Sequence, residues 1–275
     1  MKIEFKINKY YLVSHTIASK IKPFSAWEKL EDKLWGKYKN EPAYYFLNTK
    51  HINWTIEQIR WEFLNKRIEK TFQETSFRLE KIYKDIFKTK EFKKLYKETE
   101  EYLKFVKNEW DKNQKEVLNF ISKISGIKIS NKKVTVFITH PKLHNGRALT
   151  GKNIILWGHP EDWENYNTVY LCHELMHLLT WNCQKNPFLM HTIVELFTDN
   201  ELRIKLNGSG KYFKENGFEI GHHELRKLSK KLLPYWKKYL KEKTHKNIFE
   251  FEKFLIKKRV VYPPSLPVNR PVPAH

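Results

Sequence analysis

The residues best suited to chemistry lie in the stretch Tyr170–Leu179, which contains the pattern H-E-x-x-H as His173, Glu174 and His177. Residues four positions apart lie on one face of a helix, so the two imidazoles could bind a single metal ion. Glu174 lies at the edge of that face, where its carboxylate could take a proton from a water polarised by the metal. The spacing therefore predicts a zinc site suited to hydrolysis.

Two histidines are not a complete catalytic site, because a catalytic zinc typically has three protein ligands and one open position. The next predicted helix carries Glu195, and Asp199 follows one turn later on the same face. We expect Glu195 to be the third ligand and Asp199 to accept the remaining N–H of a ligand histidine. His191, one turn before Glu195, is an alternative third ligand because imidazole binds zinc well.

The order His173-Glu174-x-x-His177 and then Glu195-x-x-x-Asp199 resembles the gluzincins, the thermolysin-like and related zinc metallopeptidases. The resemblance covers residues 133–206 and rests on motif and order. It implies that zinc is bound by the two histidines and Glu195, that Glu174 is the general base, and that Asp199 supports a ligand histidine, His173 in particular. The implied substrate is a peptide or protein.

Two departures from the gluzincin pattern bear on the kind of peptidase. Val194 stands where many gluzincins have Asn before the ligand glutamate. The segment Gly151–Ile155 lacks the glutamate with which the aminopeptidase branch captures a substrate amine. The resemblance therefore favours an endopeptidase over an aminopeptidase.

A hydrolase of this kind also needs a donor that stabilises the oxyanion, a role that a His or Tyr can fill. Candidates follow the predicted ligand helix, although each of them taken alone is expected to be a structural residue: Tyr212, His222, His223 and Tyr235. The sequence His222-His223-Glu224 echoes the zinc motif, but Lys227 excludes a second site there. Further histidines flank the predicted strands and are interpreted mainly as loop residues that could line the cleft: His140, His144 and His159.

The elements that must position these residues change in character along the chain. Alternating apolar and polar residues predict a half-buried strand over residues 2–13. Helical spacing then predicts three helices, the first two opened by capping boxes at Ser25–Glu28 and Thr55–Gln58 and the third ended by Gly126. Their expected bounds are 25–41, 55–88 and 92–124.

The second half of the chain is expected to contain the catalytic elements. Strands are predicted at 133–139 and 153–157, separated by a polar loop with a turn at Asn145-Gly146. We expect the strand at 153–157 to lie beside the cleft and present an extended peptide. The helix with the zinc motif follows, and three more helices are expected at 188–206, 222–242 and 246–258.

These expectations define an α+β fold, predominantly helical, with a zincin-like core of a small sheet and active-site helices. The predicted division is a strand and long-helix region at 1–126, a zincin-like metallopeptidase domain at 127–260, and a proline-rich tail at 261–275.

Composition sets limits on partners and compartment. The formal net charge is +21, from 52 Lys and Arg against 31 Asp and Glu, which suits an anionic partner. A zinc protein that acts near nucleic acid is therefore one alternative, although the lysines are spread along the helices. A non-catalytic scaffold in which a metal ties two helices together is another.

Two cysteines without metal-ligand spacing, no signal-peptide pattern and no apolar run of membrane-spanning length favour a cytoplasmic protein. Its oligomeric state is not predicted.

Overall fold

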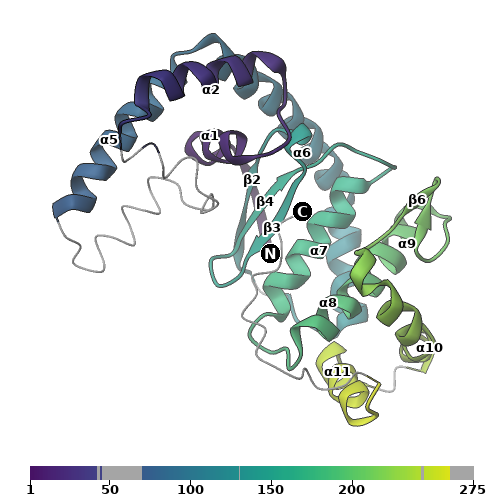
Figure 1. Ribbon diagram of the computed structural model, residues 1–275. Helices are drawn as coiled ribbons and strands as arrows, with labels where there is room; N and C mark the ends of the chain where they lie inside the picture. Colours follow the sequence, from purple (N-terminus) through teal and green to yellow (C-terminus); the bar gives the residue numbers. More distant parts are fainter. Residues whose placement is uncertain (42–43, 45–69, 130, 243–244, 261–275) are drawn as a thin grey trace.

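The computed structural model describes residues 1–41, 44, 70–129, 131–242 and 245–260, and its fold is α+β with mostly helical content (Figure 1). The helices are α1 (Lys9–Ala18), α2 (Ser25–Tyr38), α5 (Lys70–Phe87), α6 (Lys90–Ser125), α7 (Tyr166–Thr180), α8 (Pro187–Glu195), α9 (Arg203–Asn207), α10 (Arg226–Glu242) and α11 (Ile248–Lys257). Short 3-10 turns form η1 (Pro141–Leu143) and η3 (His223–Leu225), and η2 (Leu196–Leu202) is a π-helical segment. None of the described helices combines the length and the apolar character needed to cross a bilayer.

Within the described residues, four strands form the main sheet in the order β1-β2-β4-β3, and β5 (Lys214–Glu215) and β6 (Phe218–Glu219) form a separate hairpin. The main strands are β1 (Lys2–Lys6), β2 (Lys133–Ile138), β3 (Asn145–Leu149) and β4 (Ile154–Gly158). β2 is parallel to both β1 and β4, whereas β3 runs antiparallel to β4 and pairs Ala148 with Ile155. β1 thus pairs with a strand far along the chain, and the prediction of a strand near the N-terminus is confirmed for Lys2–Lys6.

Two predictions about the sheet are wrong. Residues 145–149 were expected to form a loop with an Asn-Gly turn, but they form the edge strand β3. The strand at 153–157 was expected to present substrate at an edge, but β4 lies between β2 and β3 and is buried from Ile155 to Gly158. A strand covered on both faces and paired on both sides has no free edge, so any edge near the cleft belongs to β3.

The N-terminal predictions also need correction. The strand expected over residues 2–13 ends at Lys6, and α1 begins at Lys9 because the Asn8 side chain accepts the N–H groups of Tyr10 and Tyr11 as an N-cap. The capping box expected at Ser25–Glu28 does not form, since the N-cap of α2 is Phe24. The predictions at Thr55–Gln58 and in the proline-rich tail lie outside the described residues.

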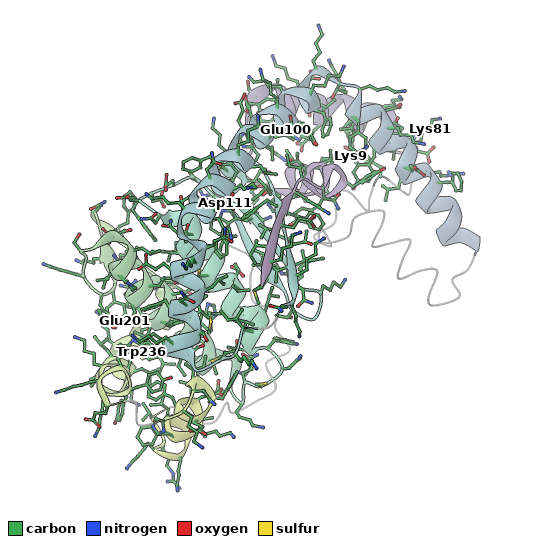
Figure 2. The ribbon with its side chains drawn as sticks, turned by 180° about the vertical axis from the view of Figure 1, so that it is seen from behind. Lys9, Lys81, Glu100, Asp111, Glu201 and Trp236 are labelled. Carbon is green, nitrogen blue, oxygen red and sulfur yellow. The ribbon has the colours of Figure 1, made fainter. Side chains whose placement is uncertain are left out.

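In the part of the chain that the structure describes, the buried apolar residues form two clusters, and α6 contributes to both. One cluster lies between α1, α2, α5 and the start of α6, including Trp27, Ile86 and Leu95. The larger one joins the sheet to α7, α8, α10, α11 and the second half of α6, where Trp110 is buried. In Figure 2, α6 runs from the N-terminal helices near Glu100 past Asp111 toward the lower part of the molecule. This 36-residue helix therefore connects the two clusters.

The end of α6 agrees with the sequence prediction. Gly126 caps the helix in the left-handed conformation with φ 68, and its N–H reaches the carbonyl of Ser122. A Cβ at this position would lie 2.2 Å from the Lys246 carbonyl oxygen, so the glycine also allows a close approach of the segment before α11.

Candidate metal centre

The helix α7 is fixed at its N-terminal end by a carboxylate from α6. Glu109 accepts the backbone N–H of Thr168 at 2.6 Å and the side-chain amide of Asn167 at 3.2 Å. A carboxylate at this position satisfies helix donors and complements the helix dipole. Apolar side chains of α7, such as Leu175 and Met176, are buried in the main core, which fixes the rotation of the helix.

The two histidines of the motif converge at one point. The Nε2 atoms of His173 and His177 lie 3.0 Å apart. Two nitrogens bound to one tetrahedral zinc at about 2.0–2.1 Å would lie roughly 3.3 Å apart. The spacing of these nitrogens therefore fits a shared divalent metal with little movement.

Asp199 lies against the histidine that the sequence assigned to it. Its Oδ1 is 2.8 Å from Nδ1 of His173 and 2.8 Å from the hydroxyl of Thr198, and the carboxylate is fully buried. Because Nδ1 of His173 donates to this carboxylate, Nε2 is the nitrogen that would give up its proton to bind a metal. The tautomer required of a ligand histidine is thus fixed by the fold.

Glu195 contacts a different histidine. Its Oε1 accepts the backbone N–H of His222 at 2.7 Å and lies 2.5 Å from the ring Nδ1 of the same residue. Gly221, at φ 81, brings this loop close, because a Cβ there would lie 2.9 Å from Oε2 of Glu195. Glu195 and His222 therefore form a second carboxylate–imidazole pair beside that of Asp199 and His173.

His191 lies between the two pairs. Its ring centroid is 4.5 Å from that of His177 and 4.6 Å from that of His222. Ligand atoms of His173, His177 and His191 lie within 4.8 Å of one another, and so do those of His191, Glu195 and His222. Glu195, the predicted third ligand, thus belongs to the second of these groups, whereas His191, the alternative, belongs to both.

The charges in the cluster are set by burial and by the carboxylates. Burial alone would lower the pKa of His173, but the charge and hydrogen bond of Asp199 outweigh it and raise the pKa of His173 to about 9. Burial and the neighbouring imidazoles of His173 and His222 hold the pKa of His177 well below its usual value. Burial also raises the pKa of Glu174, partly offset by His173 and by the backbone N–H of Ala148.

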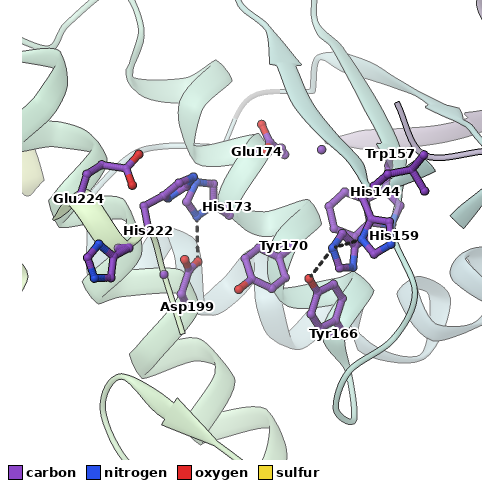
Figure 3. A pocket seen from close by; sticks show the side chains of 14 residues that line it. His144, Trp157, His159, Tyr166, Tyr170, His173, Glu174, Asp199, His222 and Glu224 are labelled. Atoms are coloured by element: carbon purple, nitrogen blue, oxygen red, sulfur yellow. Dashed lines mark hydrogen bonds and ion pairs between the residues drawn. The ribbon is translucent and has the colours of Figure 1, made fainter. Parts of the chain in front are cut away.

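A cavity of about 590 Å³ opens beside these residues (Figure 3). It is lined by Ile21, His144, Gly146, Trp157, His159, Tyr166, Tyr170, His173, Glu174, Asp199, Gly221, His222, His223 and Glu224. Its size falls within the range typical of small-ligand sites. Ile21 comes from the connection between α1 and α2, so the N-terminal region forms part of the wall.

The lining of the cavity includes two of the four predicted oxyanion donors. His222 and His223 line it, whereas Tyr212 and Tyr235 do not. Tyr235 lies on the exposed part of α10, where it packs against Phe254. Two of the flanking histidines, His144 and His159, also line the cavity, although the sequence interpretation favoured ordinary loop positions for them.

Several lining residues were not recognised from the sequence. Tyr170 and Tyr166 precede His173 by three and seven positions, which is the spacing of one helix face, so this signal was present in the pattern. Gly146 and Ile21 carried no comparable signal, because their place depends on the packing of distant segments. No family model, no curated protein and no solved structure matches this chain.

Proposed function

We propose that this protein is a zinc-dependent endopeptidase of the gluzincin type with a zincin-like core. The observation that carries the proposal is the convergence of the His173 and His177 Nε2 atoms, 3.0 Å apart, at the wall of a cavity that Glu174 also lines. Imidazole and carboxylate donors suit zinc, and the hydrogen bond from His173 to Asp199 prepares one donor nitrogen.

Zinc, when bound, supplies a Lewis acid that polarises water and the peptide carbonyl. Glu174 takes the proton from the attacking water and delivers it to the leaving amine. The raised pKa of Glu174, caused chiefly by burial, makes its carboxylate a better proton acceptor. The backbone N–H of Ala148 on β3 holds this carboxylate in place.

His173 and His177 are the proposed ligands from α7, and Glu195 is the proposed third ligand, as in the gluzincins. His191 remains the alternative, since its ligand atoms lie within 4.8 Å of those of both α7 histidines. His222 is the favoured donor for the oxyanion, because it lines the cavity and its ring is oriented by Glu195. The edge of β3 is the place where an extended peptide could pair by backbone hydrogen bonds.

Metal analysis and hydrolysis of a peptide library test this proposal together. Wild-type protein should bind about one zinc per chain and cleave peptides. The variant Glu174→Gln should keep zinc and lose hydrolysis by on the order of 10²-fold or more, whereas His177→Ala should lose the metal.

A matched control is His245→Ala, which removes an imidazole that packs on Tyr239 and Phe254 outside the cavity. It should change neither zinc content nor hydrolysis. Wild-type protein without stoichiometric metal would refute the proposal. Stoichiometric zinc without hydrolysis would instead support the alternative of a non-catalytic scaffold.

A further inference from the structure

One end of the cavity is walled by flat rings. Trp157 of β4 and Tyr170 of α7 stack with an interplanar angle of 19° and ring centroids 6.2 Å apart. His159 and Tyr166 stack in the same way at 5.0 Å and 21°. In Figure 3, Tyr170 lies between His173 and this ring cluster. The rings therefore adjoin the place where a peptide bond would meet the metal ligands.

Gly146 of β3 keeps the passage from Glu174 to these rings open. A Cβ at this position would lie 3.1 Å from Cζ3 of Trp157 and 3.6 Å from Oε1 of Glu174. Gly146 has no positive φ, so its backbone conformation does not require glycine. A glycine within a strand commonly marks a close approach, and here any side chain would occupy the space beside the Glu174 carboxylate.

The five residues that form the ring-walled end, Gly146, Trp157, His159, Tyr166 and Tyr170, include no Lys, Arg, Asp or Glu, and the acidic side chains among the described lining residues are the carboxylates of Glu174, Asp199 and Glu224. Nδ1 of His159 lies 2.8 Å from the Pro160 carbonyl, to which it donates, and Nε2 lies 3.1 Å from Nδ1 of His144. Burial lowers the pKa of His159, so its imidazole is uncharged at neutral pH. A charged substrate side chain would lose water there against rings that carry no charge of their own.

We propose that the aromatic compartment, formed by Gly146, Trp157, His159, Tyr166 and Tyr170, is a specificity subsite that accepts an uncharged aromatic side chain adjacent to the cleaved bond. This inference rests on the proposed peptidase function and names the substrate class of that site. Offset and edge-to-face contacts between rings favour an aromatic guest over an aliphatic one of similar area. One methylene group gained or lost in an apolar pocket already changes kcat/KM by about 10- to 200-fold.

The test uses zinc-loaded full-length protein and peptides that differ at one residue next to the cleavage point found in the library digest. Phe at that residue should give a kcat/KM about tenfold or more above Ala, with Lys and Glu lowest. Gly146→Val should reduce the Phe-to-Ala ratio toward one, and Tyr166→Ala should reduce it as well. The control Tyr235→Ala removes an aromatic ring outside the cavity and should leave the ratio unchanged.

Calorimetric binding to the Glu174→Gln variant separates this inference from the proposed function, and it uses one fixed pair of blocked peptides that differ only by Phe or Ala at the central residue and are chosen without reference to cleavage. If wild-type protein cleaves nothing, tighter binding of the Phe peptide that Gly146→Val abolishes still supports the subsite. The subsite is overturned if Phe and Ala peptides bind and react equally, or if their difference survives in both Gly146→Val and Tyr166→Ala. Thermal unfolding of each variant identifies a loss of selectivity that comes from misfolding. If one of the two variants is misfolded, the Phe-to-Ala ratio of the folded one tests the subsite.

Discussion

Replacing Asp199 with Asn removes the charge that orients His173 while keeping the volume of the side chain. The carboxylate is fully buried and has two partners at 2.8 Å, Nδ1 of His173 and the hydroxyl of Thr198. An amide can present its NH2 group to Nδ1, which would favour the wrong tautomer for a metal ligand. Changes to groups that support a ligand histidine cost about 10- to 100-fold in metal affinity, or about 1.4–2.7 kcal/mol. We therefore expect the zinc Kd of Asp199→Asn to rise by that factor.

Competition with a chromophoric chelator at fixed pH measures this Kd. The matched control is Glu252→Gln, because Glu252 is also a fully buried carboxylate and accepts the backbone N–H groups of Lys185 and Asn186. It should lower the free energy of unfolding but leave the zinc Kd within about twofold, since the hydrogen bonds of Glu252 go to residues 185 and 186 and not to the proposed ligand histidines. The reasoning is refuted if Asp199→Asn binds zinc as tightly as wild type, or if Glu252→Gln weakens zinc equally.

Three further predictions address stability and the ligand set. Gly126→Ala should lower the free energy of unfolding by at least about 2 kcal/mol, because the left-handed backbone and a close carbonyl both exclude a Cβ. The control is Gly36→Ala, where a Cβ meets nothing within 4 Å, and its free energy of unfolding should not fall. Partial desolvation and Glu109 raise the pKa of Glu161 to about 7 from 4.5, so the native state holds the extra proton and stability should fall as pH rises from about 4.5 to 7. In Glu161→Gln this loss of unfolding free energy between pH 4.5 and 7 should be smaller by about 1 kcal/mol, after discounting for solvent screening. Urea denaturation at several pH values measures it, and the same pH dependence in wild type and variant would contradict the assignment. Because Glu195 is the proposed third ligand, His191→Ala should leave the zinc Kd within about tenfold of the wild-type value, and a larger rise would make His191 the third ligand instead.

The long helices could be predicted because their determinants are local. The apolar spacing of α6 and the glycine at position 126 lie within one element, and both the helix and its end agree with the structure. The error at β3 has a different origin. Asn145-Gly146 is a strong turn signal, but the glycine is accommodated in a strand beside the ring of Trp157. That contact depends on the pairing of β3 with β4, which local sequence does not specify.

The boundary at the N-terminus shows the same limit on a smaller scale. Ile7 continues the alternation past Lys6, and Tyr10–Val13 is an apolar run, so the predicted strand was extended to residue 13. The side chain of Asn8 caps two backbone N–H groups and starts α1 instead. Burial of Leu12 and Val13 in the N-terminal cluster then stabilises the helix, and this burial depends on helices that follow much later in the chain.

The candidate site divides in the same way between local and distant determinants. His173 and His177 lie on one helix, so their four-residue spacing was enough to predict that they converge. Glu195 and Asp199 were expected on one face of a single α-helix, but the helix changes to the π-helical segment η2 directly after Glu195. Wider π turns place residues four apart at different angles, and such segments are frequent at functional sites. The two carboxylates consequently contact different histidines, Asp199 with His173 and Glu195 with His222. The spacing E-x-x-x-D thus identified both carboxylates, whereas the partner of Glu195 depends on the loop at Gly221, which the sequence pattern did not place.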